Sequence, residues 1–185
     1  HDKQEGELKL FFLYRISRNK NLFGALDILK KVSGFNVCYS IYGPIEEPEY
    51  WEQCKQKIKK LPENIKVEYK GVLKPEQINK NISENHFLFL PTFNENFGHV
   101  IVESFKAGCP VIISDQTPWK NLSEKKVGWE LPLSNEKAFI ETLVYCGKMG
   151  NEEFASFSQA SYAYAMEIVD NQDVLKQNID LFSNI

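Results

Sequence analysis

The chain has 185 residues, of which 43% are hydrophobic and 25% are charged. This composition is typical of a globular protein and excludes an intrinsically disordered one, and the length favours a single domain spanning residues 1–185. The 22 Lys and Arg residues are nearly balanced by 25 Asp and Glu residues, and the net charge of −3 gives no general attraction to nucleic acid or anionic lipid. Any anion must therefore be bound by a local group of cations.

The cysteines and the start of the chain indicate the compartment. No two cysteines are close enough in sequence for a zinc site or a redox dithiol, so we expect free thiols, no metal and a cytoplasmic protein. No apolar run is long enough to span a bilayer, and residues 1–7 lack the basic and apolar regions of a signal peptide. We expect residues 1–7 to be disordered or introduced by cloning, and the chain to be a piece of a longer protein.

Short apolar segments rich in β-branched and aromatic residues alternate along the chain with segments of helical length. The predicted strands are residues 8–14, 36–42, 65–69, 86–90 and 111–114. Between them, apolar residues recur three or four positions apart, as at Leu22, Ala25 and Leu29. Strand–helix alternation builds right-handed crossovers, and the continuous apolarity of the strands is typical of a sheet covered on both faces. The sequence therefore predicts an α/β fold with a Rossmann-like parallel sheet flanked by helices.

A helical tail is predicted to close the chain. After residues 129–132 the apolar spacing is helical throughout, and the predicted helices are residues 135–148, 151–166 and 172–182. No linker rich in Gly, Ser or Pro interrupts the sequence, which indicates one compact unit.

Ligands of an open parallel sheet bind beyond the carboxyl ends of its strands. The residues at these ends are polar and contain glycines, and they are residues 15–21, 43–44, 71–73, 91–98 and 114–119. The sequence therefore predicts a polar binding site along this edge.

Two carboxylates, Glu95 and Glu103, lie eight positions apart around Gly98. A glycine that opens a helix lets a ligand approach the free N–H groups of the first turn, which favour a phosphate oxygen. A carboxylate on that helix can accept hydrogen bonds from two neighbouring hydroxyls of a sugar or ribose. The spacing alone is also compatible with a solvated Glu95 in a loop and a Glu103 on the surface of a helix.

Residues 95–112, which read ENFGHVIVESFKAGCPVI, resemble the E-x7-E motif and the following A-x-G-x-P-V-I stretch of the family 4 glycosyltransferases. Residues 15–22 resemble the Arg and Lys-Asn phosphate-binding segment of that family, and residues 42–44 and 71–73 give further matches. The similarity runs from Leu8 to the end of the chain and covers the carboxyl-terminal half of such an enzyme.

The resemblance implies one half of a GT-B fold, in which the amino-terminal domain binds the acceptor and the carboxyl-terminal domain binds the nucleotide sugar. It implies a retaining glycosyltransferase of the hexosyltransferase type in polysaccharide biosynthesis, with a UDP-sugar favoured over a GDP-sugar and a glycan or lipid-linked acceptor. No metal or other cofactor is expected. The chain alone, without its acceptor-binding domain, is expected to be inactive. Its expected location is the cytoplasm, at the inner face of the membrane through the missing domain.

The same resemblance assigns roles to single residues. Glu95 would contact hydroxyls of the transferred sugar, while Arg15 and Lys20 would neutralise the diphosphate leaving group. Glu103 would bind the ribose hydroxyls. The other residues implied in donor binding are Phe97, Gly98, His99 and Val100, which would contact the diphosphate and sugar, and Gly43, Val72 and Leu73, which would line the nucleobase.

The chain departs from the family pattern at three places. Tyr14 replaces a Gly or Ser, His86 replaces an Asp, and residues 115–119 replace a glycine-rich turn. Trp119 in that turn either shapes specificity for the acceptor or the donor sugar, or packs the loop. His99 either reaches a phosphate or packs at the start of its helix.

Two other functions remain open from the sequence. The alternation of strands and helices alone also allows a non-catalytic, flavodoxin-like binding or signalling domain. Such a domain would have acids or a phosphate loop after its first strand, whereas Arg15, Arg18 and Lys20 suit an anionic ligand. A third hypothesis is an epimerase or phosphorylase related to the GT-B enzymes. The pair of Glu95 and Glu103 favours a transferase over this hypothesis.

Overall fold

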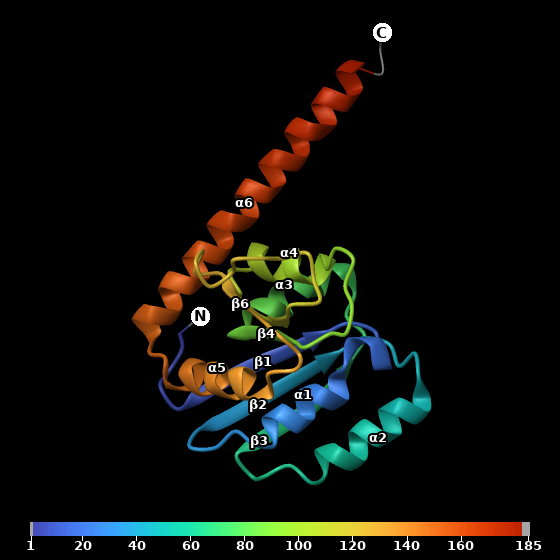
Figure 1. The fold of residues 1–185 in the computed structure, drawn as a ribbon, viewed down its shortest axis with the longest axis vertical. Helices are drawn as coiled ribbons and strands as arrows, with labels where there is room; N and C mark the ends of the chain where they lie inside the picture. Colours follow the sequence, from blue (N-terminus) through green and yellow to red (C-terminus); the bar gives the residue numbers. More distant parts are fainter. Residues whose placement is uncertain (1, 183–185) are drawn as a thin grey trace.

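The computed structural model describes residues 2–182 of the chain, with side chains up to Ile168. A single sheet of six parallel strands, in the order β3-β2-β1-β4-β5-β6, forms its centre (Figure 1). The strands are β1 (Glu7–Leu13), β2 (Asn36–Tyr42), β3 (Ile65–Gly71), β4 (Phe87–Leu90), β5 (Val111–Ser114) and β6 (Gly128–Leu131).

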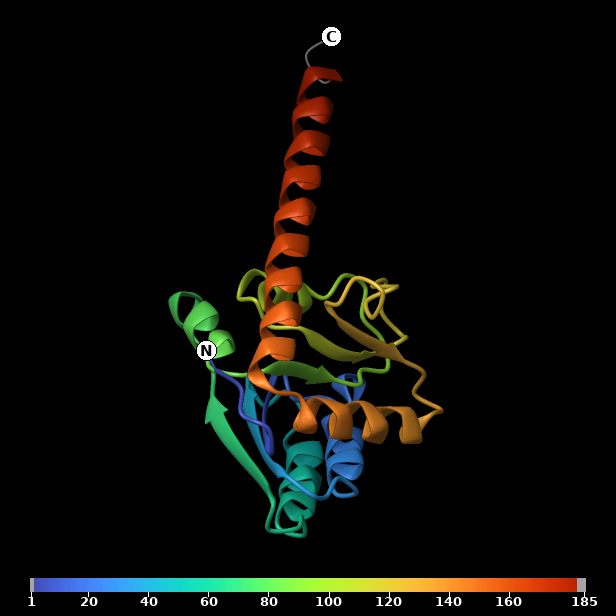
Figure 2. The same cartoon turned by 90° about the vertical axis from the view of Figure 1, so that its left-hand side faces the viewer.

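Helices cover both faces of this sheet, as Figures 1 and 2 show together. One face carries α1 (Leu22–Leu29), α2 (Pro48–Ile58) and α5 (Glu136–Lys148). The other face carries α3 (Pro75–Ser83), α4 (His99–Lys106) and the first turns of α6 (Asn151–Phe182), whose remaining turns extend past the sheet. The short 3-10 helix η1 (Arg18–Lys20) precedes α1.

The strands differ in burial according to their place in the sheet. Every residue of β4 and β5 is buried, which explains why these strands read as unbroken apolar runs. The edge strand β3 instead exposes Lys66, Glu68 and Lys70, and Glu68 forms ion pairs with both lysines. A charged edge strand of this kind resists pairing with another chain.

The predicted α/β parallel sheet is confirmed, and the structure adds a strand that the sequence did not reveal. The strand β6 reads Gly-Trp-Glu-Leu and is mostly half-buried, so it lacks the unbroken apolar run by which the equally short β4 and β5 were predicted. Gly128 opens it with φ 143°, and a Cβ atom there would lie 2.0 Å from the carbonyl oxygen of Val111. The last two predicted helices are also different, because residues 151–182 form one continuous helix.

Residues 2–7, within the stretch expected to be disordered or introduced by cloning, pack on the fold. Glu7 is already part of β1, and Lys3 is only 1% exposed. The Lys3 ammonium donates hydrogen bonds to the carbonyl oxygens of Glu7 at 3.0 Å and Met149 at 2.8 Å. Residues 2–7 thus lie against the junction of α5 and α6, where backbone carbonyls satisfy the buried ammonium of Lys3.

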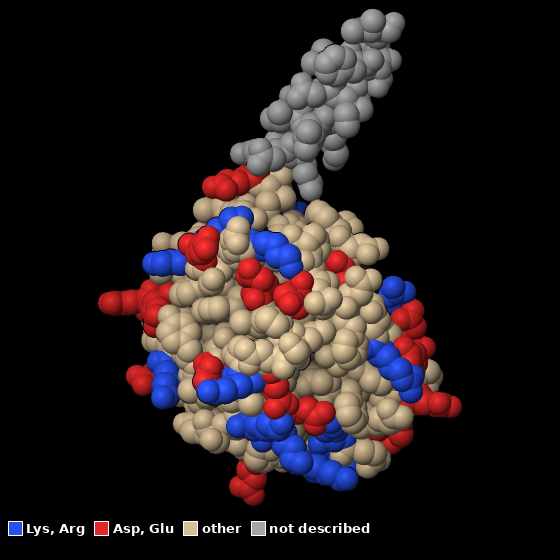
Figure 3. Space-filling model, in the orientation of Figure 1, with Lys and Arg blue, Asp and Glu red and all other residues tan. Residues whose placement is uncertain are grey.

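The surface charge is mixed in sign. On the face shown in Figure 3, Lys and Arg side chains alternate with Asp and Glu side chains over the whole body. The four cysteines are free, as expected. An anion would therefore be attracted by a local group of residues and not by the field of the whole protein.

Candidate functional site

The candidate site lies where the loops after β1 and β4 meet. These strands are neighbours in the sheet, and the strand order reverses direction between them, which is where ligands of open α/β sheets bind. The two loops are joined by hydrogen bonds. The Phe93 N–H donates to the Asn19 carbonyl at 2.9 Å, and the Asn21 side chain donates to the Pro91 carbonyl at 2.8 Å.

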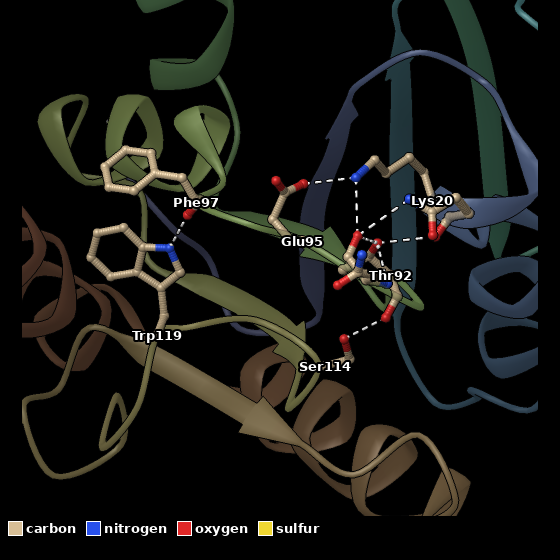
Figure 4. Close-up of polar contacts among 8 residues, drawn as sticks. Lys20, Thr92, Glu95, Phe97, Ser114 and Trp119 are labelled. Atoms are coloured by element: carbon tan, nitrogen blue, oxygen red, sulfur yellow. Dashed lines mark hydrogen bonds and ion pairs between the residues drawn. The ribbon is translucent and has the colours of Figure 1, made fainter.

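A buried ion pair connects the two loops at the centre of the site (Figure 4). Lys20 Nζ lies 2.8 Å from Glu95 Oε2, and the two side chains are only 4% and 7% exposed. The same ammonium donates to the Asn94 carbonyl at 3.1 Å and lies 4.1 Å from the centre of the Tyr14 ring. Lys20 is therefore held by three groups that stabilise its positive charge.

The surroundings of Glu95 favour its ionised form. Burial raises the pKa of Glu95, but the Lys20 ammonium, the Tyr14 hydroxyl and the Phe97 N–H together outweigh burial and hold this pKa below its usual value. Burial, followed by the charge of Glu95, raises the pKa of Tyr14. At neutral pH the site thus contains a carboxylate that can only accept hydrogen bonds.

Hydroxyl groups fix the loop that carries Glu95. The Thr92 hydroxyl lies 3.0 Å from the Asn19 carbonyl oxygen and 2.9 Å from that of Asn94, and it can donate to either. Ser114, the last residue of β5, donates to the Thr92 carbonyl at 2.5 Å. The loops after β1, β4 and β5 are therefore joined side by side at one edge of the sheet.

The helix α4 begins at Gly98, whose backbone is left-handed with φ 81°. A Cβ atom there would lie 2.7 Å from Ile101 Cδ1, so no other residue fits without strain. Within the described part of the chain, neither a backbone carbonyl nor a capping side chain accepts from the N–H groups of Gly98, His99 and Val100. Three N–H groups at a helix start are suited to binding an anion.

The two arginines near the site are each paired with a carboxylate from the loop after β2. Arg15 donates to Glu46 Oε1 at 2.9 Å, and both side chains are exposed. Arg18 forms an ion pair with Glu47, which also accepts the backbone N–H of Arg18 at 2.9 Å. An exposed ion pair contributes little stability and can exchange its partner easily. Arg15 is thus free to bind an incoming anion.

The remaining predicted residues lie along the same edge of the sheet but outside the Lys20–Glu95 contact. Glu103 is partly exposed on α4, where it accepts from Lys106 at 3.2 Å. Gly43 has φ 131°, and a Cβ atom there would lie 2.0 Å from the Tyr14 carbonyl oxygen. Its N–H donates to Gly71 at 2.9 Å, which brings the ends of β2 and β3 together.

The predicted residues just after β3 and at the start of α4 differ in how far their side chains are exposed. Val72 is exposed, while Leu73 is half-buried and packs on the core. Val100 is buried. The His99 ring is exposed and lies 5.0 Å from the ring of Phe97.

Sequence reasoning missed contacts that two aromatic residues make at the site. Tyr14 stood out only as a departure from a family pattern, yet its hydroxyl hydrogen-bonds Glu95. Trp119 is only 8% exposed, so it packs the loop, and its indole N–H also donates to the Phe97 carbonyl at 2.5 Å. Tyr14 directly follows β1 and Trp119 lies in the loop after β5, and these positions were the signal that could have identified them.

The described residues contain neither a membrane-spanning helix nor a cluster of metal ligands. Between residues 2 and 182, no helix has both the length and the apolar composition needed to cross a membrane. Over the same residues, no group of three or more His, Cys, Asp and Glu side chains is placed to hold a metal ion.

The comparison with known proteins identifies the family. The sequence profile described as "Glycosyl transferases group 1" matches residues 1–154. No curated protein matches the chain.

Solved structures share the fold at low sequence identity. A glycosyltransferase from Rickettsia africae superposes with a TM-score of 0.80 at 16% identity, over 96% of this chain and 48% of its own. HepE from Anabaena, solved with UDP and glucose, gives a TM-score of 0.76 at 19% identity, over 95% of this chain and 49% of its own. TarM from S. aureus, solved as a mutant with UDP and other ligands, gives 0.75 at 15% identity, over 97% of this chain and 36% of its own.

The chain thus spans about half the length of the first two solved structures. Its profile match covers most of the described residues, and its sheet and helices superpose on one half of these GT-B structures. The chain therefore belongs to the group 1 glycosyltransferases, the family 4 enzymes, and has the fold of one half of a GT-B enzyme.

Proposed function

We propose that the chain is the donor-binding domain, spanning residues 1–185, of a retaining glycosyltransferase that transfers a hexose from a nucleotide sugar to a glycan or lipid-linked acceptor. The observation that carries this proposal is the buried pair of Lys20 and Glu95 beside the free N–H groups at the start of α4. The arrangement offers positive groups for a diphosphate and a carboxylate for sugar hydroxyls at the same place.

A UDP-sugar is the preferred donor in this proposal. HepE was solved with UDP and glucose and with UDP-glucose, and TarM was solved with UDP. The N–H groups of Gly98, His99 and Val100, together with Phe97, would contact the diphosphate and the sugar. Glu103 would accept hydrogen bonds from the ribose.

The nucleobase would lie at the ends of β2 and β3. Gly43, Val72 and Leu73 are brought there together by the hydrogen bond from Gly43 to Gly71. Gly43 itself is buried, and its missing side chain lets the Tyr14 backbone pack against it.

The chemistry follows from charge. Breaking the anomeric bond places negative charge on the outer phosphate of the leaving group. Cations that are already in place stabilise this charge most strongly in the transition state. Lys20 is held in place by its neighbours, and Arg15 can leave Glu46 for a phosphate oxygen. The ionised Glu95 orients the sugar by accepting from its hydroxyls.

The acceptor site belongs to the other half of the enzyme in this proposal, since the chain spans about half of its structural relatives. We therefore expect the chain alone to bind a nucleoside diphosphate weakly and to transfer no sugar. The protein that contains both halves would work in the cytoplasm and reach the inner face of the membrane through the other domain.

Calorimetric titration of UDP, GDP, ADP and uridine into the purified chain tests the proposal. UDP should bind more tightly than GDP, and both should bind more tightly than uridine, because the diphosphate supplies much of the contact. If none of the three nucleoside diphosphates binds, the proposed site is overturned. Transfer of sugar by the chain alone, above a control without protein, would overturn the assignment of the acceptor site to the other half.

A further inference from the structure

The loop after β5 holds the loop that carries Glu95 through two hydrogen bonds. The Glu95 N–H donates to the Gln116 carbonyl at 3.1 Å, and the Trp119 indole N–H donates to the Phe97 carbonyl at 2.5 Å. Figure 4 shows the second of these bonds, with Glu95 between Trp119 and Lys20 in the view. The loop after β5 thus acts on the backbone just before α4 begins.

The indole is itself fixed by aromatic packing. The Trp119 ring meets the ring of Phe105 edge-on at 5.7 Å and that of Tyr164 at 6.4 Å. Lys125 lies 4.4 Å from the centre of the Tyr164 ring and donates to its hydroxyl at 3.0 Å. Trp119 is therefore a rigid donor, anchored on α4 and α6.

This hydrogen bond sets the orientation of the peptide between Phe97 and Gly98. The described residues contain no cis peptide bond, and in a trans peptide the carbonyl and the following N–H point in opposite directions. Because the indole holds the Phe97 carbonyl on its own side, the Gly98 N–H points away from Trp119. That N–H is one of the three at the start of α4 without a partner among the described residues.

The peptide needs such a restraint because of the glycine. Gly98 has φ 81° and ψ 64°, a region where a glycine moves freely among several backbone conformations. The neighbouring Phe97 side chain is exposed, and its ring meets that of Trp119 edge-on at 5.7 Å, so this contact too depends on Trp119. Without the indole N–H, the peptide could turn and present a carbonyl oxygen in place of the N–H.

We propose that Trp119 is a positioning residue whose indole N–H orients the 97–98 peptide so that the Gly98 N–H faces the diphosphate or sugar of the donor. The inference rests on the proposed function. It adds a residue that acts on the donor through the peptide between Phe97 and Gly98. Its effect is to increase the fraction of molecules that are ready to bind the diphosphate.

The test replaces the indole by rings that cannot donate. Trp119→Phe keeps an aromatic ring against Phe105 and Tyr164, and benzothienylalanine at position 119 keeps the indole shape with sulfur in place of the N–H. The matched control is Trp129→Phe, because Trp129 stacks on Phe157 at 5.0 Å and lies in β6, away from the site. UDP and uridine are titrated into each protein by calorimetry.

We expect both changes at position 119 to weaken UDP binding on the order of 10-fold, because the fraction of molecules ready to bind falls. The affinity for uridine should stay unchanged. Trp129→Phe should leave both affinities unchanged. In spectra of ¹⁵N-labelled protein, UDP should shift the Gly98 amide signal of the wild type, and this shift should shrink in the benzothienylalanine protein.

The outcomes separate the inference from the function on which it rests. If the wild-type chain binds UDP and the proteins changed at position 119 bind it equally well, the role of Trp119 is overturned and the proposed function stands. Equal losses for UDP and uridine would show that Trp119 only packs the loop and would also overturn the inference. A wild-type chain that does not bind UDP would overturn the proposed function together with the inference. If the Trp119→Phe protein does not fold, the UDP affinity of the benzothienylalanine protein alone tests the role of the indole N–H.

Discussion

Lys20 and Glu95, 75 positions apart in the sequence, neutralise each other's charge at 2.8 Å in a place that water scarcely reaches. The pair serves the fold and the site at once. Removing either partner leaves a buried charge without its counter-ion, which is among the most destabilising changes that one substitution can make. Effects of these two residues on ligand binding must therefore be separated from their effects on stability.

Lys20→Met should lower the free energy of unfolding by about 3–5 kcal/mol, the usual cost of breaking a buried ion pair. The double variant Lys20→Met with Glu95→Leu should recover much of this loss, since no charge then remains unpaired. Urea denaturation measures both. As a control, Lys31→Met breaks an exposed pair with Glu136 and should cost less than about 1 kcal/mol. A Lys20→Met protein as stable as the wild type would contradict the buried pair.

Arg15→Ala should weaken UDP by about 1–3 kcal/mol, the value of hydrogen bonds to a charged group, because a cation for the diphosphate is lost. Uridine should bind as before. Arg15→Lys should recover only part of the loss, since an ammonium lacks the planar fork that binds two oxygens together. Calorimetry at two salt concentrations checks the charge effect, which salt should weaken. Equal losses for UDP and uridine would remove Arg15 from the phosphate site.

Glu103→Ala should weaken UDP by about 1.5–3 kcal/mol if its carboxylate accepts from the ribose hydroxyls. The same change should have no effect on 2′,3′-dideoxy-UDP, which lacks them. Lys106→Ala is the matched control, because it removes the present partner of Glu103 and leaves the carboxylate in place. Should the dideoxy ligand lose as much affinity as UDP in the Glu103→Ala protein, Glu103 does not bind the ribose.

The stability of the chain should fall in mild acid because of His86. Burial, followed by the charges of Lys3 and Lys9, lowers the pKa of His86 from 6.5 to about 3. Its Nδ1 accepts the Lys9 N–H at 3.0 Å, which requires the neutral ring. Below the pKa of the unfolded state, the unfolded chain binds a proton that the folded chain does not. The free energy of unfolding should therefore fall by about 1.4 kcal/mol between about pH 7.5 and about pH 5.5.

Urea denaturation at several pH values measures this slope. His86→Gln removes the titrating ring and should flatten the slope over the same range. A wild-type slope that survives in the His86→Gln protein would assign the effect to another group.

Much of the fold could be predicted because its signals are local. The strands β1, β2, β4 and β5 read directly as apolar runs, and Gly98 marked the start of α4 because a helix start with a glycine is a local pattern. The packing of residues 2–7 could not be predicted, because Lys3 contacts the carbonyl of Met149, 146 positions away.

The candidate site was predicted only in part. The resemblance assigned Glu95 and Lys20 to the ligand, and no sequence pattern indicated that they bind each other across 75 positions. The pairing of Arg15 with Glu46 and the bond from Trp119 to Phe97 are likewise contacts between loops that only the assembled sheet brings together. Contacts of this kind depend on tertiary structure, which propensity and spacing do not encode.

The strand order also affects how the protein is made. The strand β1 is the first strand in the chain, yet it lies at the centre of the sheet between β2 and β4. Its second partner begins only at Phe87, so at a synthesis rate of about 5–20 residues per second the apolar edge of β1 stays open for roughly 4 to 15 seconds. During that interval an unpaired strand edge can associate with other chains. The nascent chain on the ribosome, more than the finished domain, is the form that chaperones have to protect from aggregation.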